Sequence, residues 1–431
     1  MVVPRVDLRV DHLRWRQVLD HLAGDEDEVA ALLVRARPTD DPAVVVIEGW
    51  RPVDEAAVVD RSRGLRWNGR LNLRLAREAE STGQGVVFVH RHPGRSTPRL
   101  SPTDRDRGRA LMRFLRRRCP RATHGIVVLS DDGIAGWLEG PSGRRRIGEV
   151  RDSGPPLLVM PGRRARTVGS PDDRQLLAFG LSGMAALTTG RVGLVGVSGG
   201  GSHVGEQLIH AGIGTLIPVD SQLVEDTNLR RLVGARRRDV DVTRKVDVPR
   251  RLAREVRPTV RVIPIAEDFP SERSLALLRT VDVLVGCVDA WDVRDDLNTF
   301  ALEHRIPYVD IGAVITPPTA GFGVRASGQI AIVVPGGPCL RCMGIVTDAR
   351  VEQARRRRLG YLGGVAEPQV VSVNGTLASE AVSATMLLLA GSDTYVPRRR
   401  YSLPPGLLQE VTAKRDPLCP ACREVGRRSL T

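Results

Sequence analysis

The pattern of apolar and polar residues differs between the first and second parts of the chain. In the first part, short β-branched runs predict buried strands at 43–48, 85–89 and 125–130. Helical spacing between these runs predicts helices at 73–81 and 105–118. The segment 25–34 is acidic and then apolar, which favours an amphipathic helix or the end of one. We therefore expect a compact α+β domain over residues 1–152.

The second part shows a regular alternation of strand and helix patterns. Continuous apolar runs predict strands at 192–197, 215–220, 260–265 and 283–287. Helical patterns between them predict helices at 202–211, 246–255 and 271–279. Such alternation is typical of a parallel, doubly wound sheet. The predicted fold class is therefore α/β, with a doubly wound, mostly parallel Rossmann-like domain over 171–431.

A stretch rich in glycine, proline and arginine lies between the two parts. It extends from 141 to 170, and its composition predicts a linker with at most one short strand, at 157–160. We place the linker proper at 153–170. The two domains are then expected to fold around separate cores.

The composition fits a folded protein that does not cross a membrane. The chain has 431 residues, of which 42% are apolar and 26% charged, so each expected domain is long enough to bury a core. The longest apolar runs fall short of the ~20 residues that a membrane helix needs. The first residues lack the apolar stretch of a signal peptide. We therefore expect a cytoplasmic protein without a membrane partner.

Arginine supplies nearly all of the positive charge. The net charge is +14, and Lys245 and Lys414 are the only lysines. Aromatic residues make up 3% of the chain, so the arginine clusters have few neighbours on which nucleic-acid bases could stack. A nucleic-acid partner is therefore not expected. A solvated basic surface is the favoured interpretation, and attraction for an acidic protein is the alternative.

A glycine-rich turn connects the first predicted strand of the second domain to its first helix. Residues 192–202 read VGLVGVSGGGS and include Gly196, Gly199 and Gly201. Glycines let a backbone approach a phosphate, and the helix N-terminus offers amide donors. Asp220 ends the next predicted strand, where an acidic residue can hold a ribose hydroxyl. Ser198 interrupts the strict G-x-G-x-x-G pattern, so this turn alone is weak support for a nucleotide site.

The residues from this turn onward resemble the ThiF/MoeB-like adenylating superfamily, the fold of ubiquitin-activating enzymes. The matching segments occur in order over roughly 172–422: Arg174-Gln175, GVSGGGS, VDSQLVEDTNLRR, Lys245 before a helix, VGCVDAWDVRDDLN, GQIAIVVPGGPCLRC and the terminal CPAC. The ordered set is far more specific than any single member. The resemblance implies ATP binding and transfer of AMP to the C-terminal carboxylate of a small ubiquitin-like or sulfur-carrier protein.

The same resemblance implies roles for individual residues. Contacts to the phosphates and ribose of ATP are implied for Gly196, Gly199, Gly201 and Asp220. Stabilisation of the charge that develops as the carboxylate attacks the α-phosphate is implied for Asn228, Arg231 and Lys245. Asp289 would bind Mg²⁺. Arg174 would reach across a subunit interface, which implies a homodimer.

Three positions differ from the family pattern. Ser198 replaces a glycine, Gln222 replaces the second acid of Asp-x-Asp, and Ala290 replaces the asparagine after the Mg²⁺-binding aspartate. A nucleotide-binding scaffold without turnover is therefore an alternative. Cys287 falls in a predicted strand, where a small core residue is expected, and Cys119 lies outside this domain. We therefore expect adenylation without a thioester on this chain.

Four of the six cysteines form two C-x-x-C pairs. Cys339 and Cys342 make the first pair, and Cys419 and Cys422 make the second. Four thiolates suit a closed, tetrahedral and therefore structural Zn²⁺ site that ties the C-terminal segment to the sheet. Redox-active dithiols are the alternative, but prolines beside both pairs favour knuckle turns.

The first domain contains a second candidate metal site. His90 and His92 end a predicted strand, where residues two apart share one face, so both rings could meet one metal. His-x-His-Pro followed by Ser101-x-x-Asp104 resembles the JAB/MPN (JAMM) metalloprotease signature over roughly 10–140. The resemblance implies a catalytic Zn²⁺ bound by His90, His92 and Asp104. It further implies Ser101 as the oxyanion stabiliser and Glu28 as the base.

The residues also allow simpler interpretations of this second site. Ser101 could be a helix N-cap and Asp104 a residue of the first helical turn. Glu26 and Glu48 also precede the histidines, so the glutamate assignment rests on local pattern alone.

Taken together, the two domains predict a bifunctional bacterial protein that acts on one ubiquitin-like or sulfur-carrier partner. The N-terminal zinc site would process or remove the tail of that partner, and the C-terminal site would activate the tail with ATP. An adenylase of cofactor, sulfur or peptide-natural-product biosynthesis is the alternative among enzymes.

Overall fold

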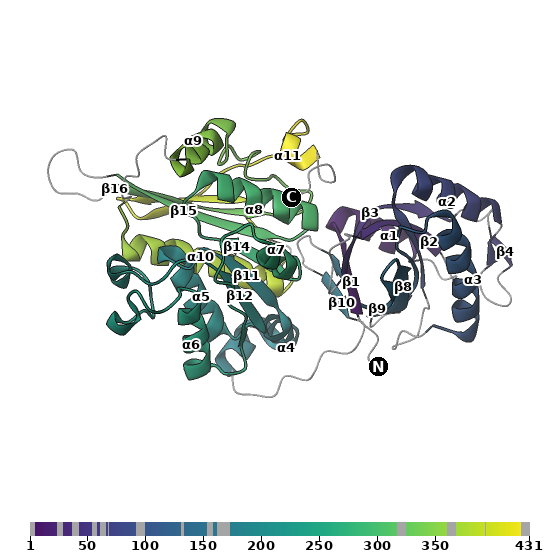
Figure 1. Cartoon of the computed structure of the whole chain (residues 1–431), viewed down its shortest axis with the longest axis horizontal. Helices are drawn as coiled ribbons and strands as arrows, with labels where there is room; N and C mark the ends of the chain where they lie inside the picture. Colours follow the sequence, from purple (N-terminus) through teal and green to yellow (C-terminus); the bar gives the residue numbers. More distant parts are fainter. Residues whose placement is uncertain are drawn as a thin grey trace. The chain divides into compact units, whose positions relative to one another are not determined.

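The computed structural model describes most of the chain. The described residues are 5–23, 29–36, 43–53, 58–60, 66–67, 69–91, 100–130, 133–152, 158–161, 173–316, 325–359, 368–392 and 394–423. They form two compact units, of which the first contains β1 to β10 and the second α4 to α11 (Figure 1). None of the helices in these ranges is long and apolar enough to cross a membrane.

The first unit contains ten strands and three helices among the described residues. In chain order they are β1 (Arg5–Val10), α1 (His12–His21), β2 (Val29–Ala36), β3 (Ala43–Pro52), β4 (Val58–Asp60), β5 (Arg66–Trp67), α2 (Gly69–Thr82), β6 (Gly85–Arg91), α3 (Pro102–Arg118), β7 (His124–Ser130), β8 (Gly133–Gly140), β9 (Gly143–Asp152) and β10 (Leu158–Pro161). The main sheet has the order β1-β3-β2-β6-β7-β8-β9-β10, and β1 also pairs with β9, so the sheet closes on itself. The N-terminal domain is thus α+β, as predicted.

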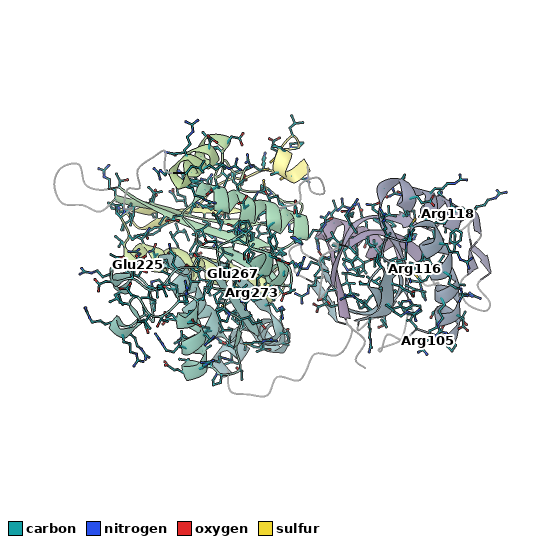
Figure 2. The ribbon with its side chains drawn as sticks, viewed as in Figure 1. Arg105, Arg116, Arg118, Glu225, Glu267 and Arg273 are labelled. Atoms are coloured by element: carbon teal, nitrogen blue, oxygen red, sulfur yellow. The ribbon has the colours of Figure 1, made fainter. Side chains whose placement is uncertain are left out.

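The two faces of this sheet are buried in different cores. Along β6, Val87 and Val89 face a cluster that contains Trp15 of α1. Val86 and Phe88 belong to the opposite cluster with α2 and α3. Because side chains alternate along a strand, His90 is expected on the face of α2 and α3. Figure 2 labels Arg105 and Arg118, two exposed arginines near opposite ends of α3.

Two predictions for the first unit are wrong. The part of segment 25–34 that is described is not helical, because β2 begins at Val29. Alternate residues of β2 contribute to both cores, with Ala30, Leu32 and Val34 in one cluster and Val29, Ala31 and Leu33 in the other. An apolar run buried on both faces suits a strand. The linker prediction is also wrong over Gly143–Asp152, where β9 pairs with β1 and β8.

The second unit contains a single large sheet and its covering helices. In chain order the elements are α4 (Asp173–Thr189), β11 (Arg191–Val195), α5 (Gly199–Ala211), β12 (Thr215–Val219), two short 3₁₀ helices (Asp226–Arg230 and Arg237–Asp239), α6 (Asp247–Val256), β13 (Arg261–Val262), α7 (Glu272–Leu278), β14 (Val283–Gly286), α8 (Trp291–His304), β15 (Tyr308–Thr316), β16 (Arg325–Val333), α9 (Asp348–Arg358), α10 (Val371–Leu389), β17 (Arg398–Leu403), β18 (Leu407–Glu410) and α11 (Pro420–Arg423).

The sheet order is β13-β12-β11-β14-β15-β16-β17-β18. The strands from β13 to β15 are parallel, which confirms the doubly wound Rossmann-like prediction. The predicted strand 260–265 is shorter, since β13 covers only Arg261–Val262. The antiparallel continuation from β15 to β18 was not predicted. The chain reverses its direction of winding between β11 and β14, the position at which doubly wound sheets bind ligands.

Helices cover both faces of this sheet. Residues of α4, α5, α6 and α10 pack with β11, β14 and β16 in one core. Residues of α7 and α8 form the core on the other face, which also contains Cys339 and Cys419. Figure 1 shows α9 and α10 on opposite sides of β15 and β16. The helices cover the faces of the sheet and not its edge at the carboxyl ends of the parallel strands. The loops that follow the strands lie at that edge.

Candidate functional site

The glycine-rich turn after β11 packs tightly at the start of α5. Gly196 has a φ of +85°, and a Cβ there would lie 2.7 Å from the Cys287 carbonyl oxygen. A Cβ on Gly201 would lie 1.9 Å from the Gly196 carbonyl oxygen. These contacts require glycine, because only glycine fits this conformation and this close approach. Gly196 and Gly199 line a cleft, whereas Gly201 holds the helix against the turn.

Asp220 follows β12 and is fixed beside this turn. Its Oδ2 accepts a hydrogen bond of 2.9 Å from the Val197 amide. Its Oδ1 accepts one of 3.0 Å from the Gln222 amide. The carboxylate therefore lies at the carboxyl edge of the sheet next to the glycine turn, which is where the sequence predicted it.

The loop between β12 and α6 carries the three predicted charge-stabilising residues to the same cleft. Lys245 is only 2% exposed, and its Nζ donates a 2.5 Å hydrogen bond to Gln222 Oε1. Asn228 is buried, and its Oδ1 accepts from the Glu225 amide at 3.1 Å. Arg231 donates to the Thr227 carbonyl at 3.2 Å. Gln222 is a neutral partner, and Lys245 forms no ion pair with a described residue, so its ammonium group can act on an anionic ligand.

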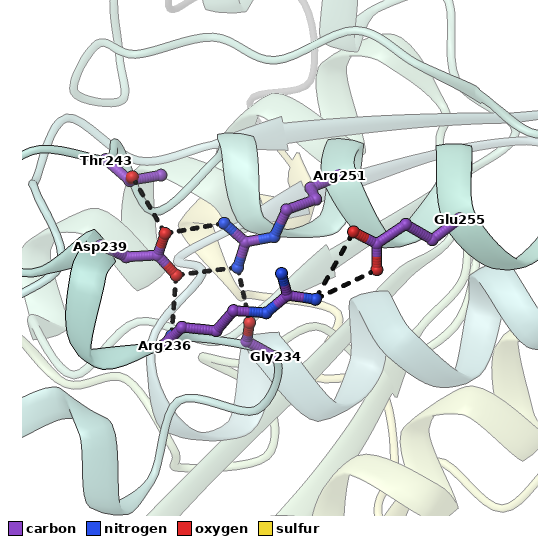
Figure 3. A network of polar contacts seen from close by, with 6 residues as sticks. All are labelled: Gly234, Arg236, Asp239, Thr243, Arg251 and Glu255. Carbon is purple, nitrogen blue, oxygen red and sulfur yellow. Dashed lines mark hydrogen bonds and ion pairs between the residues drawn. The ribbon is translucent and has the colours of Figure 1, made fainter.

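A polar network holds this loop in place (Figure 3). Arg251 of α6 donates two hydrogen bonds to the Asp239 carboxylate, at 2.7 and 2.8 Å, and a third to the Gly234 carbonyl. Asp239 also accepts from the Arg236 amide and from Thr243 Oγ1. The hydrogen bonds from Arg251 lower the pKa of Asp239 to about 2. Asp239 is thus ionised at neutral pH and connects Arg236 and Thr243 of the loop to α6.

The region after β14 provides Asp289 on the opposite side of the turn. Asp289 is exposed and lines the cleft. Beneath it, Arg294 and Asp310 form a buried ion pair, and the Tyr308 hydroxyl donates to Asp310 at 2.8 Å. The Arg294 charge is therefore neutralised within the fold.

Cys287 differs from its predicted place in the strand core. It follows the last residue of β14, is half-buried and lines the cleft. Burial and the nearby Asp310 carboxylate raise the pKa of the Cys287 thiol well above its ordinary value. The thiol is therefore protonated at neutral pH and is a poor nucleophile.

These residues surround one cleft of about 1480 Å³. The predicted residues that line it are Gly196, Gly199, Asp220, Asn228, Arg231, Lys245 and Asp289.

Arg174 belongs to α4, but its side chain lies outside the described part of the structure. The sequence interpretation missed Asn374 of α10 and three arginines, Arg350, Arg398 and Arg400, which also line the cleft. The alternation of Arg398, Arg400 and Ser402 was the available signal for β17.

The four cysteines of the two C-x-x-C pairs form a compact cluster. Their sulfur atoms all lie within 4.8 Å of one another. The Sγ–Sγ distances are 3.7 Å for Cys339 to Cys342 and to Cys419, and 3.5 Å for Cys342 to Cys422. Zinc–sulfur bonds of about 2.3 Å in a tetrahedron place sulfurs about 3.8 Å apart. The cluster therefore fits Zn²⁺, and among the described residues it is the only such group of metal-ligating side chains.

The first unit brings two of its predicted metal ligands together. His90 Nε2 lies 3.3 Å from Asp104 Oδ1, and His90 pairs across the sheet with Val29. His92 and Glu28, which precedes Val29 in the sequence, lie outside the described residues.

Ser101 and Asp104 also have the helix-capping geometry that the sequence allowed. Ser101 is the N-cap of α3, and the two residues form a reciprocal capping box. Burial acts to raise the pKa of Asp104, but His90 and Ser101 outweigh it and hold the pKa well below its usual range. The two carboxylate oxygens are divided, Oδ2 to the Ser101 amide at 2.7 Å and Oδ1 to His90. Asp104 can therefore cap the helix through Oδ2 while its Oδ1 still points at His90.

Comparison with known proteins identifies the second unit. A model of the ThiF family matches residues 173–421. The adenylyltransferase and sulfurtransferase UBA4 of Yarrowia lipolytica is 30% identical over 264 residues, which are 59% of this chain and 61% of UBA4. The molybdopterin-synthase adenylyltransferase of Escherichia coli is 26% identical over 255 residues, which are 58% of this chain and 94% of that protein.

The solved structures show the same fold. A crystal structure of E. coli MccB with MccA-N7isoASN matches with a TM-score of 0.50 at 19% identity, over 59% of this chain and 75% of MccB. The chain spans about three fifths of the length of UBA4. Because the family model covers more than half of the sequence, the chain belongs to the ThiF family.

Proposed function

We propose that this chain uses ATP to adenylate the C-terminal carboxylate of a small ubiquitin-like or sulfur-carrier protein. The observation that carries the proposal is the convergence of Asp220, Lys245 and Asp289 with the glycine turn on one cleft. The glycine turn follows β11, Asp220 and Lys245 lie on the loop after β12, and Asp289 lies on the loop after β14. These three loops meet at the topological switch point of the sheet. The names of UBA4 and of the E. coli relative, both adenylyltransferases, support the same reaction.

The chemistry proposed for the cleft is a single displacement at phosphorus. A carboxylate oxygen of the tail attacks the α-phosphorus of ATP, and the bond from that phosphorus to the bridging oxygen of pyrophosphate breaks. Pyrophosphate leaves with the bonding electron pair, and the tail becomes an acyl-adenylate. Such transfer depends on positioning and on cations directed at oxygen rather than on covalent chemistry by the protein.

The residues of this chain then have distinct tasks. The turn at Gly196 and Gly199 and the first amides of α5 bind phosphate, and Asp220 holds the ribose. Asn228, Arg231 and Lys245 stabilise the negative charge that grows on the phosphoryl oxygens. Mg²⁺, which Asp289 would hold, neutralises phosphate charge when it is bound.

The proposal extends to assembly and to the fate of the acyl-adenylate. Arg174 acts across the interface of a homodimer. The high pKa of the Cys287 thiol supports release of the acyl-adenylate without a thioester on this residue. Zinc at the four cysteines is structural and joins 339–342 to 419–422.

ATP–pyrophosphate exchange tests the reaction directly. With carrier proteins that end in Gly-Gly as substrates, the wild-type chain should catalyse exchange that depends on the carrier. Asp289→Ala should reduce it at least ~100-fold, since the metal is lost, while Asp226→Ala on an exposed site nearby should not. Exchange that is unchanged in Asp289→Ala contradicts the assignment. ATP binding without exchange for any carrier would instead favour a scaffold without turnover.

A second activity, zinc-dependent hydrolysis at the tail of the same partner, is proposed for the first unit. It rests on the 3.3 Å approach of His90 and Asp104 at the end of β6. His90, His92 and Asp104 would bind Zn²⁺ and leave one position for water, as catalytic zinc requires. Glu28 would take a proton from that water, and Ser101 would stabilise the oxyanion.

Zinc content separates the two metal sites. The purified chain should contain two zinc ions, and a His90→Ala/His92→Ala variant should contain one, since the cysteine site is retained. One zinc in both proteins would contradict the proposed hydrolase site and leave the first unit without a catalytic metal.

A further inference from the structure

The charges that line the cleft are distributed unevenly. Its acidic residues follow the parallel strands, and they are Asp220, Glu225, Glu267, Asp268 and Asp289; Figure 2 labels Glu225 and Glu267. The residues contributed by α9 and β17 include five arginines and no carboxylate. The cleft therefore has an end at the parallel strands, where the nucleotide residues lie, and a strongly basic end at α9 and β17.

The alternation along β17 directs particular arginines into this basic end. Arg398, Arg400 and Ser402 line the cleft. Arg399, which lies between the first two, points to the other face and pairs with Glu380 of α10 at 2.8 Å. Successive side chains of a strand point to opposite faces, so Arg399 is a matched control for Arg400.

Three arginines at this end lack acidic partners in the described part of the chain, whereas Arg358 pairs with Asp292. Arg398 donates to Gln329 Oε1 and to the Met343 carbonyl, both at 2.8 Å. Arg350 donates to the Ile345 carbonyl and stacks over the Trp291 ring at 4.7 Å. Arg400 is exposed. The side chains of Arg350 and Arg398 thus hydrogen-bond only to neutral groups, and that of Arg400 makes no hydrogen bond to a described residue. No described carboxylate neutralises these three charges.

The three charges also act on one another. Burial and the positive charges of Arg400 and Arg350 lower the pKa of Arg398. Like charges held together in a cleft repel, and an anionic ligand relieves that repulsion. In contrast, Arg294, which also lines the cleft, already has Asp310 as its partner.

We propose that these three arginines select a substrate tail with acidic residues before its terminal glycines. The inference rests on the proposed adenylation, because the terminal carboxylate must reach the phosphate site near Lys245 and Asp289. The residues that precede it then occupy the rest of the same cleft. Glutamate or aspartate side chains of the tail bind Arg350, Arg398 and Arg400 there.

Short fluorescent peptides that end in Gly-Gly test this selection. They carry Glu, Gln or Lys before the glycines and are titrated with the full chain by fluorescence anisotropy, together with a non-hydrolysable ATP analogue. The Glu peptide should bind about tenfold more tightly than the Gln peptide, which corresponds to about 1.4 kcal/mol. The preference should weaken as salt is raised.

Variants of two neighbouring arginines make the test specific. Arg400→Glu should abolish or reverse the preference for the Glu peptide, and Arg399→Gln should retain it. The Arg400 side chain is exposed and makes no hydrogen bond to a described residue, and a substitution keeps the backbone pairing of β17 with β16 and β18, so folding of the variant is expected. Equal affinities for the three peptides, including undetectable binding of all three, overturn the inference, as does a preference that survives in Arg400→Glu.

Two further results would assign the arginines elsewhere. Weaker binding of the ATP analogue to Arg400→Glu, with unchanged peptide binding, would mean that they bind the phosphates of the nucleotide. Tighter binding of a single-stranded oligonucleotide than of the Glu peptide would mean a nucleic-acid partner. Either result contradicts a selected acidic tail. Selective binding of the Glu peptide without pyrophosphate exchange would support the charge preference and contradict the adenylation.

Discussion

The two units build their candidate sites on sheets of different kinds. In the second unit, parallel strands β11, β12 and β14 end at one edge, and the residues after them meet at that edge. In the first unit, the candidate ligands come from the end of β6 and the start of α3. In a parallel sheet, loops that are distant in the sequence meet at one edge because the strands end there. The position of the ligands in the first unit depends instead on the backbone conformation of a few residues at the end of β6 and the start of α3.

The polar pairs at the two sites differ in the same way. Arg294 and Asp310 are 3% and 0% exposed and are completed by Tyr308. His90 and Asp104 are 11% and 15% exposed, and Asp104 shares its carboxylate with a helix cap. The first pair is a part of the core. The second pair has the accessibility and the divided carboxylate that a metal site can use.

Loss of the cysteine cluster should have the largest effect, and only on the second unit. The double change Cys339→Ser/Cys419→Ser removes two ligands of the proposed structural zinc, so the free energy of unfolding should fall by more than ~5 kcal/mol and Tm by more than ~10 °C. Hydrogen–deuterium exchange should rise in β14 and α8 but not in β6. Cys119→Ala should keep the zinc content unchanged. Equal exchange in both units would contradict the separation of their cores.

The Arg294–Asp310 and His90–Asp104 pairs should respond unequally to removal of one partner. Arg294→Met leaves the Asp310 carboxylate buried without its cation and should destabilise the chain by about 3–5 kcal/mol. Asp104→Asn keeps a capping oxygen and should cost about 1 kcal/mol. Denaturant unfolding measures both. A cost for Asp104→Asn equal to that of Arg294→Met would show that the His90–Asp104 pair is also a core element.

Titration of one aspartate in each unit should give the smallest effect. Burial, with Glu149 nearby, raises the pKa of Asp7 from 3.8 to about 6, and burial with Asp295 and Asp292 does the same for Asp296. The folded chain holds these protons more tightly, so their stabilising contribution is present below about pH 4. It is lost as the pH rises through about 6.

The corresponding asparagine variants check this sign. Asp7→Asn and Asp296→Asn should each raise Tm by a few degrees at pH 8, on the order of 1 kcal/mol after allowance for solvent screening. Neither should change Tm at pH 4. The exposed Asp226→Asn serves as the control, and lower stability of the Asp7 and Asp296 variants at pH 8 would contradict the account.

The sequence predicted those parts of the fold whose patterns are local. The runs before Gly196, Asp220 and Asp289 are short and apolar, and each became a parallel strand. The segment 29–34 failed because Ala and Leu favour helices, while burial on both faces of a closed sheet overrides that preference. Strands β16 and β17 were missed because polar side chains that face a cleft interrupt their apolar pattern.

The candidate site was predictable where function requires particular residue types. Lys245 is one of only two lysines in a chain that otherwise uses arginine, and Asp220 follows a strand, where an acidic residue was expected. Arg398 and Arg400 looked like surface charges, because only the register of β17 turns them towards the cleft. The neutralisation of Arg294 by Asp310 depends on packing between α8 and β15, which no local pattern contains.

The transfer of AMP to a carrier tail is the most direct test of the account. Intact-mass spectrometry of a carrier that ends in Gly-Gly, incubated with ATP, Mg²⁺ and the chain, should reveal a carrier that has gained one adenylyl group. The product should be absent with Lys245→Gln and present with Arg399→Gln. Formation of the adenylate by Lys245→Gln at the wild-type rate, or its absence with every Gly-Gly carrier tested, would contradict the claim that this cleft activates a carboxylate.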